Sequence, residues 1–259
     1  MVHGNPTWSF YYRNLIGALR PSYRAIALDH IGCGLSDKPA KTEYNYTLAQ
    51  RVADLDRLIE HLQLEKFTLI VHDWGGMIGF AWAAAHPERL ANLVVMNTAA
   101  FPLPAAKRLP LSLKLARTPG LGALLVRGLN AFSRGAVMHC TTKALSHDVA
   151  QGYLRPYNSW ANRLAVHRFV QDIPLSPKDE AYDVVLQTQQ HLGRLKQLPM
   201  LLCWGMQDFV FDSDFLEVWE KHFPEAQAHR FADAGHYVLE DAGQEIQKLI
   251  EGFLGNRQT

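Results

Sequence analysis

Leu69-Ile70-Val71-His72-Asp73-Trp74-Gly75-Gly76 carries the strongest structural signal in the sequence. The stretch begins as an apolar, β-branched run, which is typical of a buried strand, and ends in a glycine-rich turn. A helical segment, 77–85, follows at once. A strand, a sharp turn and a helix in direct succession expose the central turn residue as a nucleophile at the helix N-terminus. That residue is Asp73, where serine is commoner, so we expect a carboxylate that forms an ester with an electrophilic carbon.

Strand and helix patterns alternate on both sides of this turn. We expect strands at 23–28, 67–71, 93–96, 200–203 and 229–231, and helices at 48–62, 77–86 and 244–254. Between 103 and 191 the alternation stops and the sequence is helical and irregular. The pattern predicts an α/β fold with a mostly parallel sheet. We expect an N-terminal core part at 1–102, an inserted helical cap at 103–191 and a C-terminal core part at 192–259.

The first residues predict a truncated start. The turn at His3-Gly4 would normally follow a full strand, and only Met1 and Val2 precede it. We therefore expect the first strands of the sheet to be missing at the N-terminus, which amounts to roughly 25–40 residues. Their absence would leave the run at 23–28 with an unpaired edge.

The composition excludes several classes of protein. The chain has 259 residues, 48% of them hydrophobic, and a formal net charge of +1, so no strong field indicates nucleic acid as a partner. Three widely spaced cysteines, Cys33, Cys140 and Cys203, form no zinc pattern and fit a reducing compartment. No apolar run has membrane-spanning length, so we expect a cytoplasmic protein. For the leucine-rich run 109–129 we favour an internal cap helix over an element that touches a membrane or an apolar substrate.

Three further segments complete a candidate catalytic site. The loop 3–8 is rich in Gly, Asn and Pro, so it can turn backbone N–H groups and the Asn5 amide toward the site. Asp208 follows the strand 200–203 and can orient a histidine; Asp212 and Asp214 are its competitors. His236 lies in a glycine turn after the last strand. Nucleophile, acid and histidine then follow each other in the order that a strand–turn–helix nucleophile predicts.

These segments resemble the haloalkane dehalogenase branch of the α/β-hydrolase superfamily. The matching segments are 3–7, 29–39, 72–76 and 235–236, and the resemblance covers essentially the whole chain; of the family's pattern, only the first strands that we expect to be missing are left out. It implies the α/β-hydrolase fold, and side chains of Asn5 and Trp74 that together hold a departing anion. Within this branch the sequence is most similar to the β-lactone decarboxylases of olefin biosynthesis, through the segments 8–15, 155–160 and 169–175.

The resemblance implies a reaction. Asp73 would attack a small hydrophobic β-lactone with long alkyl chains, and the adduct would collapse to carbon dioxide and a cis-alkene. Asp208 would orient His236, and no cofactor or metal is implied. Other enzymes of the olefin pathway, a β-lactone synthetase and a reductase, would be its partners.

Three alternatives stay open at this point. In a haloalkane dehalogenase, Asp73 would displace halide and His236 would activate water. An epoxide hydrolase would need cap tyrosines as acids, for which Tyr153, Tyr157 and Tyr182 are the candidates. A non-catalytic ligand receptor is also compatible with the fold, although the set of catalytic residues argues against it. Arg155 and Arg163 of the cap are expected to be ordinary ion-pair or capping residues rather than ligands for a carboxylate.

Overall fold

A computed structural model describes residues 1–104 and 107–255 of the chain. Within these residues, four parallel strands form one sheet in the order β1-β2-β3-β4. Their bounds are Phe67–His72 (β1), Leu90–Met96 (β2), Met200–Gly205 (β3) and Gln227–Phe231 (β4). Val2 forms an isolated parallel bridge with Val71 on the open side of β1. The sheet is therefore parallel, as the alternating pattern predicts.

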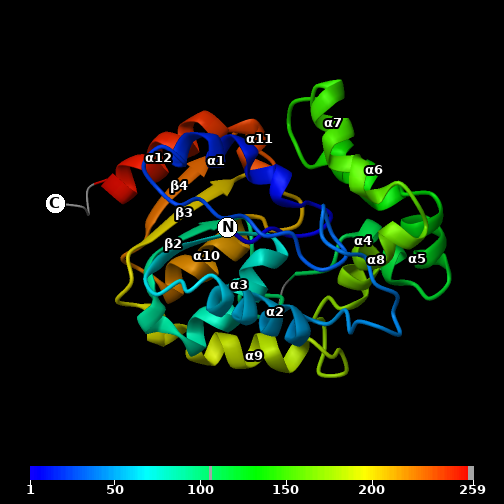
Figure 1. Ribbon diagram of the computed structural model, residues 1–259, viewed down its shortest axis with the longest axis horizontal. Helices are drawn as coiled ribbons and strands as arrows, with labels where there is room; N and C mark the ends of the chain where they lie inside the picture. The colour runs from blue at the N-terminus through cyan, green and yellow to red at the C-terminus, as the bar shows by residue number, and fades with distance from the viewer. Residues whose placement is uncertain (105–106, 256–259) are drawn as a thin grey trace.

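Helices cover both faces of the sheet (Figure 1). One layer contains α2 (Leu48–His61), α3 (Trp74–Ala85), α9 (Tyr182–His191) and α10 (Ser213–His222). The other layer contains α1 (Arg13–Leu19), α11 (Val238–Asp241) and α12 (Gly243–Gly255). Alternate strand residues enter the two cores: Leu69 and Val71 join the first, and Ile70 joins the second. Burial on both faces explains why Leu69, Ile70 and Val71 of β1 are apolar in succession rather than alternating with polar residues.

The cap is inserted between β2 and β3 and lies beyond the carboxyl ends of the strands (Figure 1). Its helices are α4 (Leu111–Arg117), α5 (Leu121–Ala123), the π-helical turn η3 (Leu124–Gly128), α6 (Ala131–His139), α7 (His147–Leu154) and α8 (Leu164–Gln171). Short 3₁₀ turns at Arg155–Tyr157 and Ala161–Arg163 connect the last two. The helix α9 packs on α3 beside the sheet, which favours a cap that ends before it.

Two expectations about local structure need correction. The run 23–28 is not a strand: two backbone hydrogen bonds join it to Met1, from Met1 N to Ile26 O (2.8 Å) and from Leu28 N to Met1 O (3.4 Å). A strand needs a neighbour along its whole length, and among the described residues the backbone pairing of 24–28 is with Met1. The leucine-rich run 109–129 is not one helix, because Pro119 and Gly120 end α4 and turn the chain before α5.

Candidate active site

Asp73 stands in the turn between β1 and α3, with φ 52° and ψ −129°. The two glycines that follow make this turn possible, because other elements approach them too closely for a side chain. A Cβ atom on Gly75 would lie 2.0 Å from the carbonyl oxygen of Val2, and one on Gly76 would lie 1.9 Å from Thr98 Oγ1. The Thr98 hydroxyl donates a hydrogen bond to the Asp73 carbonyl. Neighbouring segments therefore hold the turn rigidly at the carboxyl end of β1.

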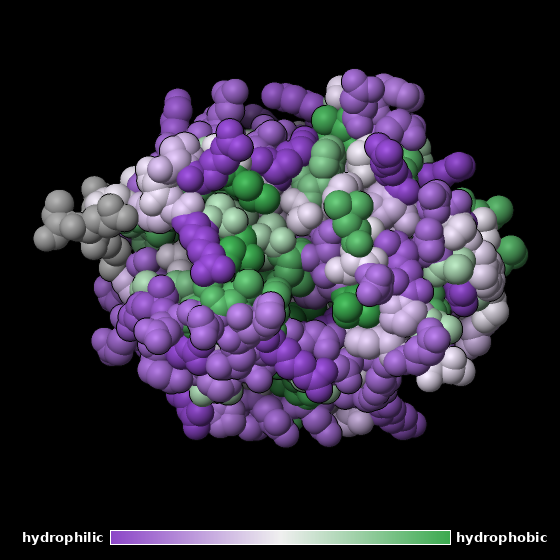
Figure 2. Space-filling model, viewed as in Figure 1, coloured by the Kyte–Doolittle hydropathy of each residue, from purple (hydrophilic) through white to green (hydrophobic). Residues whose placement is uncertain are grey.

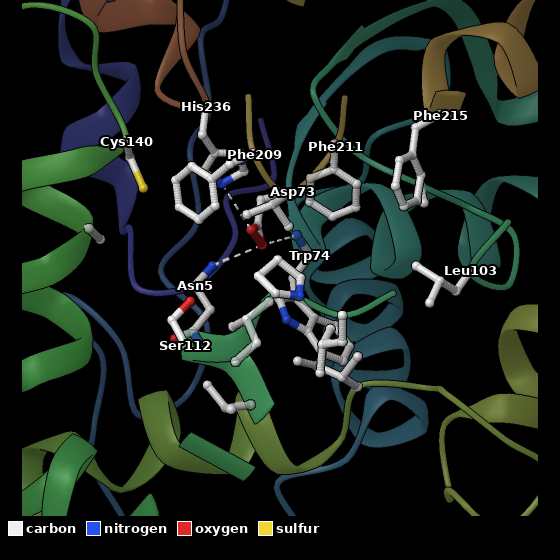
Figure 3. A pocket seen from close by; sticks show the side chains of 18 of the residues that line it. Asn5, Asp73, Trp74, Leu103, Ser112, Cys140, Phe209, Phe211, Phe215 and His236 are labelled. Atoms are coloured by element: carbon white, nitrogen blue, oxygen red, sulfur yellow. Dashed lines mark hydrogen bonds and ion pairs between the residues drawn. The ribbon is translucent and has the colours of Figure 1, made fainter. Parts of the chain in front are cut away.

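The structure brings Asp73, His236 and Asp208 into one chain of contacts. Figure 3 shows the Asp73–His236 part of this chain. His236 Nε2 lies 3.2 Å from Asp73 Oδ2, and His236 Nδ1 lies 2.8 Å from Asp208 Oδ2. All three side chains are buried. The competitors of Asp208 point elsewhere, since Asp212 and Asp214 pair with Lys107. Of the three candidate acids, Asp208 is thus the one in contact with the histidine.

Asn97 is a member of the site that the sequence analysis did not identify. It follows β2 directly, and its Nδ2 donates a hydrogen bond to Asp208 Oδ2 at 3.0 Å. Its amide also pairs with the backbone of Gly205, through Oδ1 at 2.8 Å and Nδ2 at 3.0 Å. The Val210 N–H donates to the other oxygen of Asp208 at 2.7 Å. A polar residue immediately after a buried strand was the available signal.

Two backbone N–H groups converge on the second oxygen of the Asp73 carboxylate. The Asn5 N–H donates to Asp73 Oδ1 at 3.2 Å, and the Trp74 N–H donates to the same atom (Figure 3). Hydrogen bonds to a carboxylate from fixed backbone donors are strong and orient it. They hold Oδ1 in place and leave Oδ2, on the side of His236, as the oxygen that can attack a substrate.

The side chains of Asn5 and Trp74 both line the cavity above Asp73. In the described part of the chain, no group accepts a hydrogen bond from the Trp74 indole N–H, so this donor is available to a ligand. The Asn5 amide is partly engaged, because Nδ2 donates to Val166 O of α8 at 3.2 Å. Asn5 Oδ1 is buried without a partner among the described residues. The two predicted anion-holding side chains therefore lie together, and the amide is tied to the cap.

Charge stabilises a protonated His236. Burial alone would lower the pKa of His236, but the neighbouring carboxylates of Asp208 and Asp73 raise it to about 10. Burial would likewise raise the pKa of Asp208, and the charge and hydrogen bond of His236 outweigh that effect and lower it. The resting site is therefore a carboxylate–imidazolium–carboxylate chain.

A second histidine supports the segment that carries His236. His72 lies next to Asp73 in the sequence, and burial lowers its pKa to about 3, so its ring is neutral. Its Nε2–H can donate to the backbone carbonyl of His236, 2.8 Å away. Asp241 holds the same loop from the other side, because its carboxylate accepts from Gly235 N at 2.8 Å and from Thr142 N of the cap at 3.0 Å. The histidine loop is thereby joined to both core and cap.

A cavity of about 510 Å³ lies over Asp73. It extends to two sides of the carboxylate: in Figure 3 Cys140 lies on one side and Leu103, Phe211 and Phe215 lie on the other. Further apolar groups from α6 line the first side. The lining is mainly apolar, so the cavity suits a hydrophobic molecule whose reactive centre lies between two apolar chains.

Tyr153, Tyr157 and Arg163 of the cap have partners away from Asp73. The Tyr153 hydroxyl donates to Glu240, and the Tyr157 hydroxyl donates to Thr7 O at 3.1 Å. Neither these two nor Tyr182 is among the described residues that line the cavity. Arg163 donates to backbone carbonyls, including Tyr157 O at 2.8 Å, as expected of a capping residue. None of these three tyrosines lines the cavity over Asp73, so none is placed to act as the acid of an epoxide hydrolase. The structure therefore gives no support to epoxide hydrolysis.

The family described as the alpha/beta hydrolase fold matches residues 1–243. The chain therefore belongs to the α/β-hydrolase-fold family. It is 51% identical over 261 residues to the cis-3-alkyl-4-alkyloxetan-2-one decarboxylase of Shewanella oneidensis, a match that covers 100% of this chain and 82% of the relative. The decarboxylase of the same name from Xanthomonas campestris is 44% identical, covering 98% of this chain and 87% of the relative.

Among solved structures, the haloalkane dehalogenase of Bradyrhizobium elkani superposes with a TM-score of 0.88 at 25% identity, covering 98% of this chain and 88% of that one. The resemblance that the motifs indicated is therefore confirmed, both for the fold and for the order of similarity. Across residues 1–104 and 107–255, no helix has the length and apolar character that a membrane span requires. In the same residues, no group of three or more His, Cys, Asp or Glu side chains is placed to hold a metal ion.

Proposed function

We propose that the chain decarboxylates cis-3,4-dialkyl β-lactones, giving a cis-alkene and carbon dioxide, with Asp73 as the nucleophile. The observation that carries this proposal is the cavity that extends to two sides of the Asp73 carboxylate. A lactone ring with an alkyl chain on each of two adjacent carbons needs two apolar arms, whereas a simple haloalkane needs one. The 51% identical relative from Shewanella oneidensis is a decarboxylase named for an oxetan-2-one with two alkyl groups, which supports the same substrate.

In the first step, Asp73 Oδ2 attacks ring carbon C4 of the lactone. The C4–O bond of the ring breaks, an ester forms between Asp73 and C4, and the former ring oxygen becomes part of a free carboxylate on C3. The Asn5 and Trp74 N–H groups hold Oδ1 throughout, which keeps the nucleophile aligned. The Trp74 indole N–H and the Asn5 amide are the donors available to the new carboxylate.

In the second step, the ester collapses without water. The electrons of the bond between C3 and the carboxylate form the C3=C4 double bond, carbon dioxide leaves, and the C4–O bond to Asp73 breaks. The Asp73 carboxylate is regenerated and no proton is consumed. Attack at the lactone carbonyl would instead leave an alkoxide on C4. The Asp73 carboxylate is a better leaving group from C4 than this alkoxide, which favours attack at C4. In this scheme His236 and Asp208 orient Asp73 and balance its charge rather than transfer a proton.

Haloalkane hydrolysis is the second candidate, and one observation favours it. The unpaired Trp74 indole N–H beside Asp73 is suited to a halide as well as to a carboxylate. Once Asp73 is esterified, one of the two charges that raise the pKa of His236 disappears, so its pKa falls and the ring can act as a base on water. The same residues can therefore complete a hydrolysis if water enters the cavity.

The experiment that separates these reactions uses two substrates on one protein. The purified chain is incubated with a synthetic cis-3,4-dialkyl β-lactone and, separately, with a bromoalkane, and alkene and bromide are measured. Alkene from the lactone supports the proposal. Bromide release without any alkene would replace it by dehalogenation, and neither product from a folded protein would favour a ligand receptor. We also place the chain in the cytoplasm beside other enzymes of alkene formation, which supply a lactone too apolar to diffuse freely.

A further inference from the structure

The outer face of the cap carries exposed leucines on several adjacent helical segments. Leu111 and Leu115, one turn apart on α4, are 71% and 41% exposed, and Leu124 in η3 is 55% exposed. Leu121, Leu129 and Trp160 of the neighbouring segments are also exposed, and Figure 2 shows hydrophobic side chains at the outer edge of the cap, where Figure 1 places α5. Single exposed leucines are ordinary on a protein surface, but a cluster on adjoining elements marks a surface that contacts something apolar.

The helix α4 is apolar on two opposite faces. Its inner face supplies Ser112 and Leu113 to the lining of the cavity over Asp73. Its outer face presents Leu111, Lys114 and Leu115, which are all exposed. A surface helix that only covered the cavity would be polar on the outside. The outer leucines therefore serve a contact outside the protein, at the helix that also forms a wall of the substrate cavity.

The same part of the chain concentrates positive charge. Between residues 107 and 163 the sequence has nine Lys or Arg side chains and one acidic side chain, Asp148, although the whole chain has a formal charge of +1. Lys107 and Arg117 pair with acids from outside this segment. Lys114 and Arg134 are exposed, and no carboxylate of the described residues lies within ion-pair distance of either. The cap surface is thus suited to an anionic partner.

The arrangement of these residues distinguishes a lipid surface from a protein partner. Lys114 lies between Leu111 and Leu115, and Arg127 lies between Leu124 and Leu129 and stacks on Trp160 at 4.3 Å. The centre of a protein–protein interface is poor in lysine. Leucine and tryptophan interleaved with Lys and Arg are typical of helices that lie in the headgroup region of a membrane. We propose that this cap surface docks peripherally on a bilayer that contains anionic lipids, with the cavity wall α4 at the contact.

The proposal goes beyond the decarboxylation reaction and does not depend on it, because it rests on the leucines and the charge of the cap alone. Its consequence for any apolar substrate is direct. Docking through α4 brings a wall of the cavity over Asp73 to the headgroup region of the bilayer in which such a molecule dissolves.

Vesicle flotation tests the proposal with the full chain. We expect the protein to float with vesicles of phosphatidylcholine and phosphatidylglycerol, and to float far less with phosphatidylcholine alone or in high salt. Lys114→Gln and Arg134→Gln should each lower the partition onto anionic vesicles about fivefold. The double variant Leu111→Ser/Leu115→Ser should lower it about tenfold or more. The matched control Lys248→Gln, an exposed lysine of α12 on the core, should leave it unchanged.

Thermal unfolding of each variant establishes that its fold is intact. If Leu111→Ser/Leu115→Ser is unstable, Lys114→Gln and Arg134→Gln provide the test. Equal binding to both kinds of vesicle, or binding that the cap variants and the control alter equally, would overturn the proposal. So would absence of binding. If the chain instead sediments as a dimer that Leu111→Ser/Leu115→Ser dissociates, this surface is a protein interface and the lipid proposal is wrong.

Discussion

Asn97 donates a hydrogen bond to the same oxygen of Asp208 that contacts His236 Nδ1, at 3.0 Å from the amide and 2.8 Å from the ring. The amide is itself fixed by two hydrogen bonds to the backbone of Gly205. Asn97, at the carboxyl end of β2, therefore orients the Asp208 carboxylate toward His236. A buried carboxylate depends on such donors, because burial disfavours its charged form.

We expect Asn97→Ala to destabilise the protein by about 1–3 kcal/mol, since it leaves Asp208 and the Gly205 backbone short of buried hydrogen bonds. Turnover should fall as well, because Asp208 loses a donor that orients it toward His236. Urea unfolding and steady-state assays measure the two effects. The matched control is Asn92→Ala: Asn92 lies on β2, the strand that Asn97 follows, and its amide donates a hydrogen bond to Thr68 at 3.1 Å, away from the site. Equal loss of turnover in both variants would contradict a positioning role for Asn97.

Local sequence patterns were sufficient to predict the strand, the turn and the helix around Asp73. The strand, the turn and the helix around Asp73 are contiguous in the chain, so each leaves its own signature. Asp208 and His236 were predictable for a related reason, because the carboxyl ends of parallel strands meet at one edge of the sheet. Their contact in the structure follows from that topology. The number of residues between them in the sequence does not predict it.

Other features depend on contacts that a single sequence does not display. The Asn5 N–H that reaches Asp73 Oδ1 is a backbone group, and every residue but proline has one. The role of Asn97 requires knowing that β2 lies next to β3. The run 23–28 has the composition of a strand, but a strand forms only where a neighbour accepts its hydrogen bonds. These are properties of the assembled sheet rather than of the segments.

Replacement of Asp73, the proposed nucleophile, is the most direct test of the site. Asp73→Asn keeps the size and much of the hydrogen bonding of the side chain and removes the anionic oxygen that, in our proposal, forms the ester. We expect alkene formation to drop by about 10⁴-fold or more, as is usual for loss of a covalent nucleophile. Asp212→Asn is the control, because Asp212 lines the same cavity but pairs with Lys107. A fully active Asp73→Asn would exclude this residue as the nucleophile.

The charge of His236 makes folding stability depend on pH. Its pKa is raised from 6.5 to about 10 in the folded protein by Asp208 and Asp73, against the effect of burial. A raised folded pKa contributes stability that is complete below the unfolded value and is lost as the pH rises through the folded one. Between about pH 6.5 and 10 we expect the free energy of unfolding to fall by up to about 1.4 kcal/mol per pH unit.

Urea unfolding across this pH range measures that loss, and His236→Gln is the comparison. The variant lacks the titrating ring, so its free energy of unfolding should be lower at neutral pH. It should also change less between neutral pH and pH 10. The same steep decline in both proteins would show that other groups, and not His236, carry the pH dependence.

His236→Gln also distinguishes a collapse without water from hydrolysis. In the proposed decarboxylation, no proton moves in either step, so the variant should still form alkene from the β-lactone, slowed by about 10²-fold because Asp73 loses a charged partner. With a bromoalkane, release of the alkyl group requires water that His236 activates, so the variant should release about one bromide per protein and retain the alkyl group on Asp73. Intact-protein mass spectrometry measures the adduct, and gas chromatography measures the alkene. A variant that accumulates a stable lactone adduct and forms no alkene would show that His236 acts in the collapse itself, and the proton-free second step would have to be abandoned.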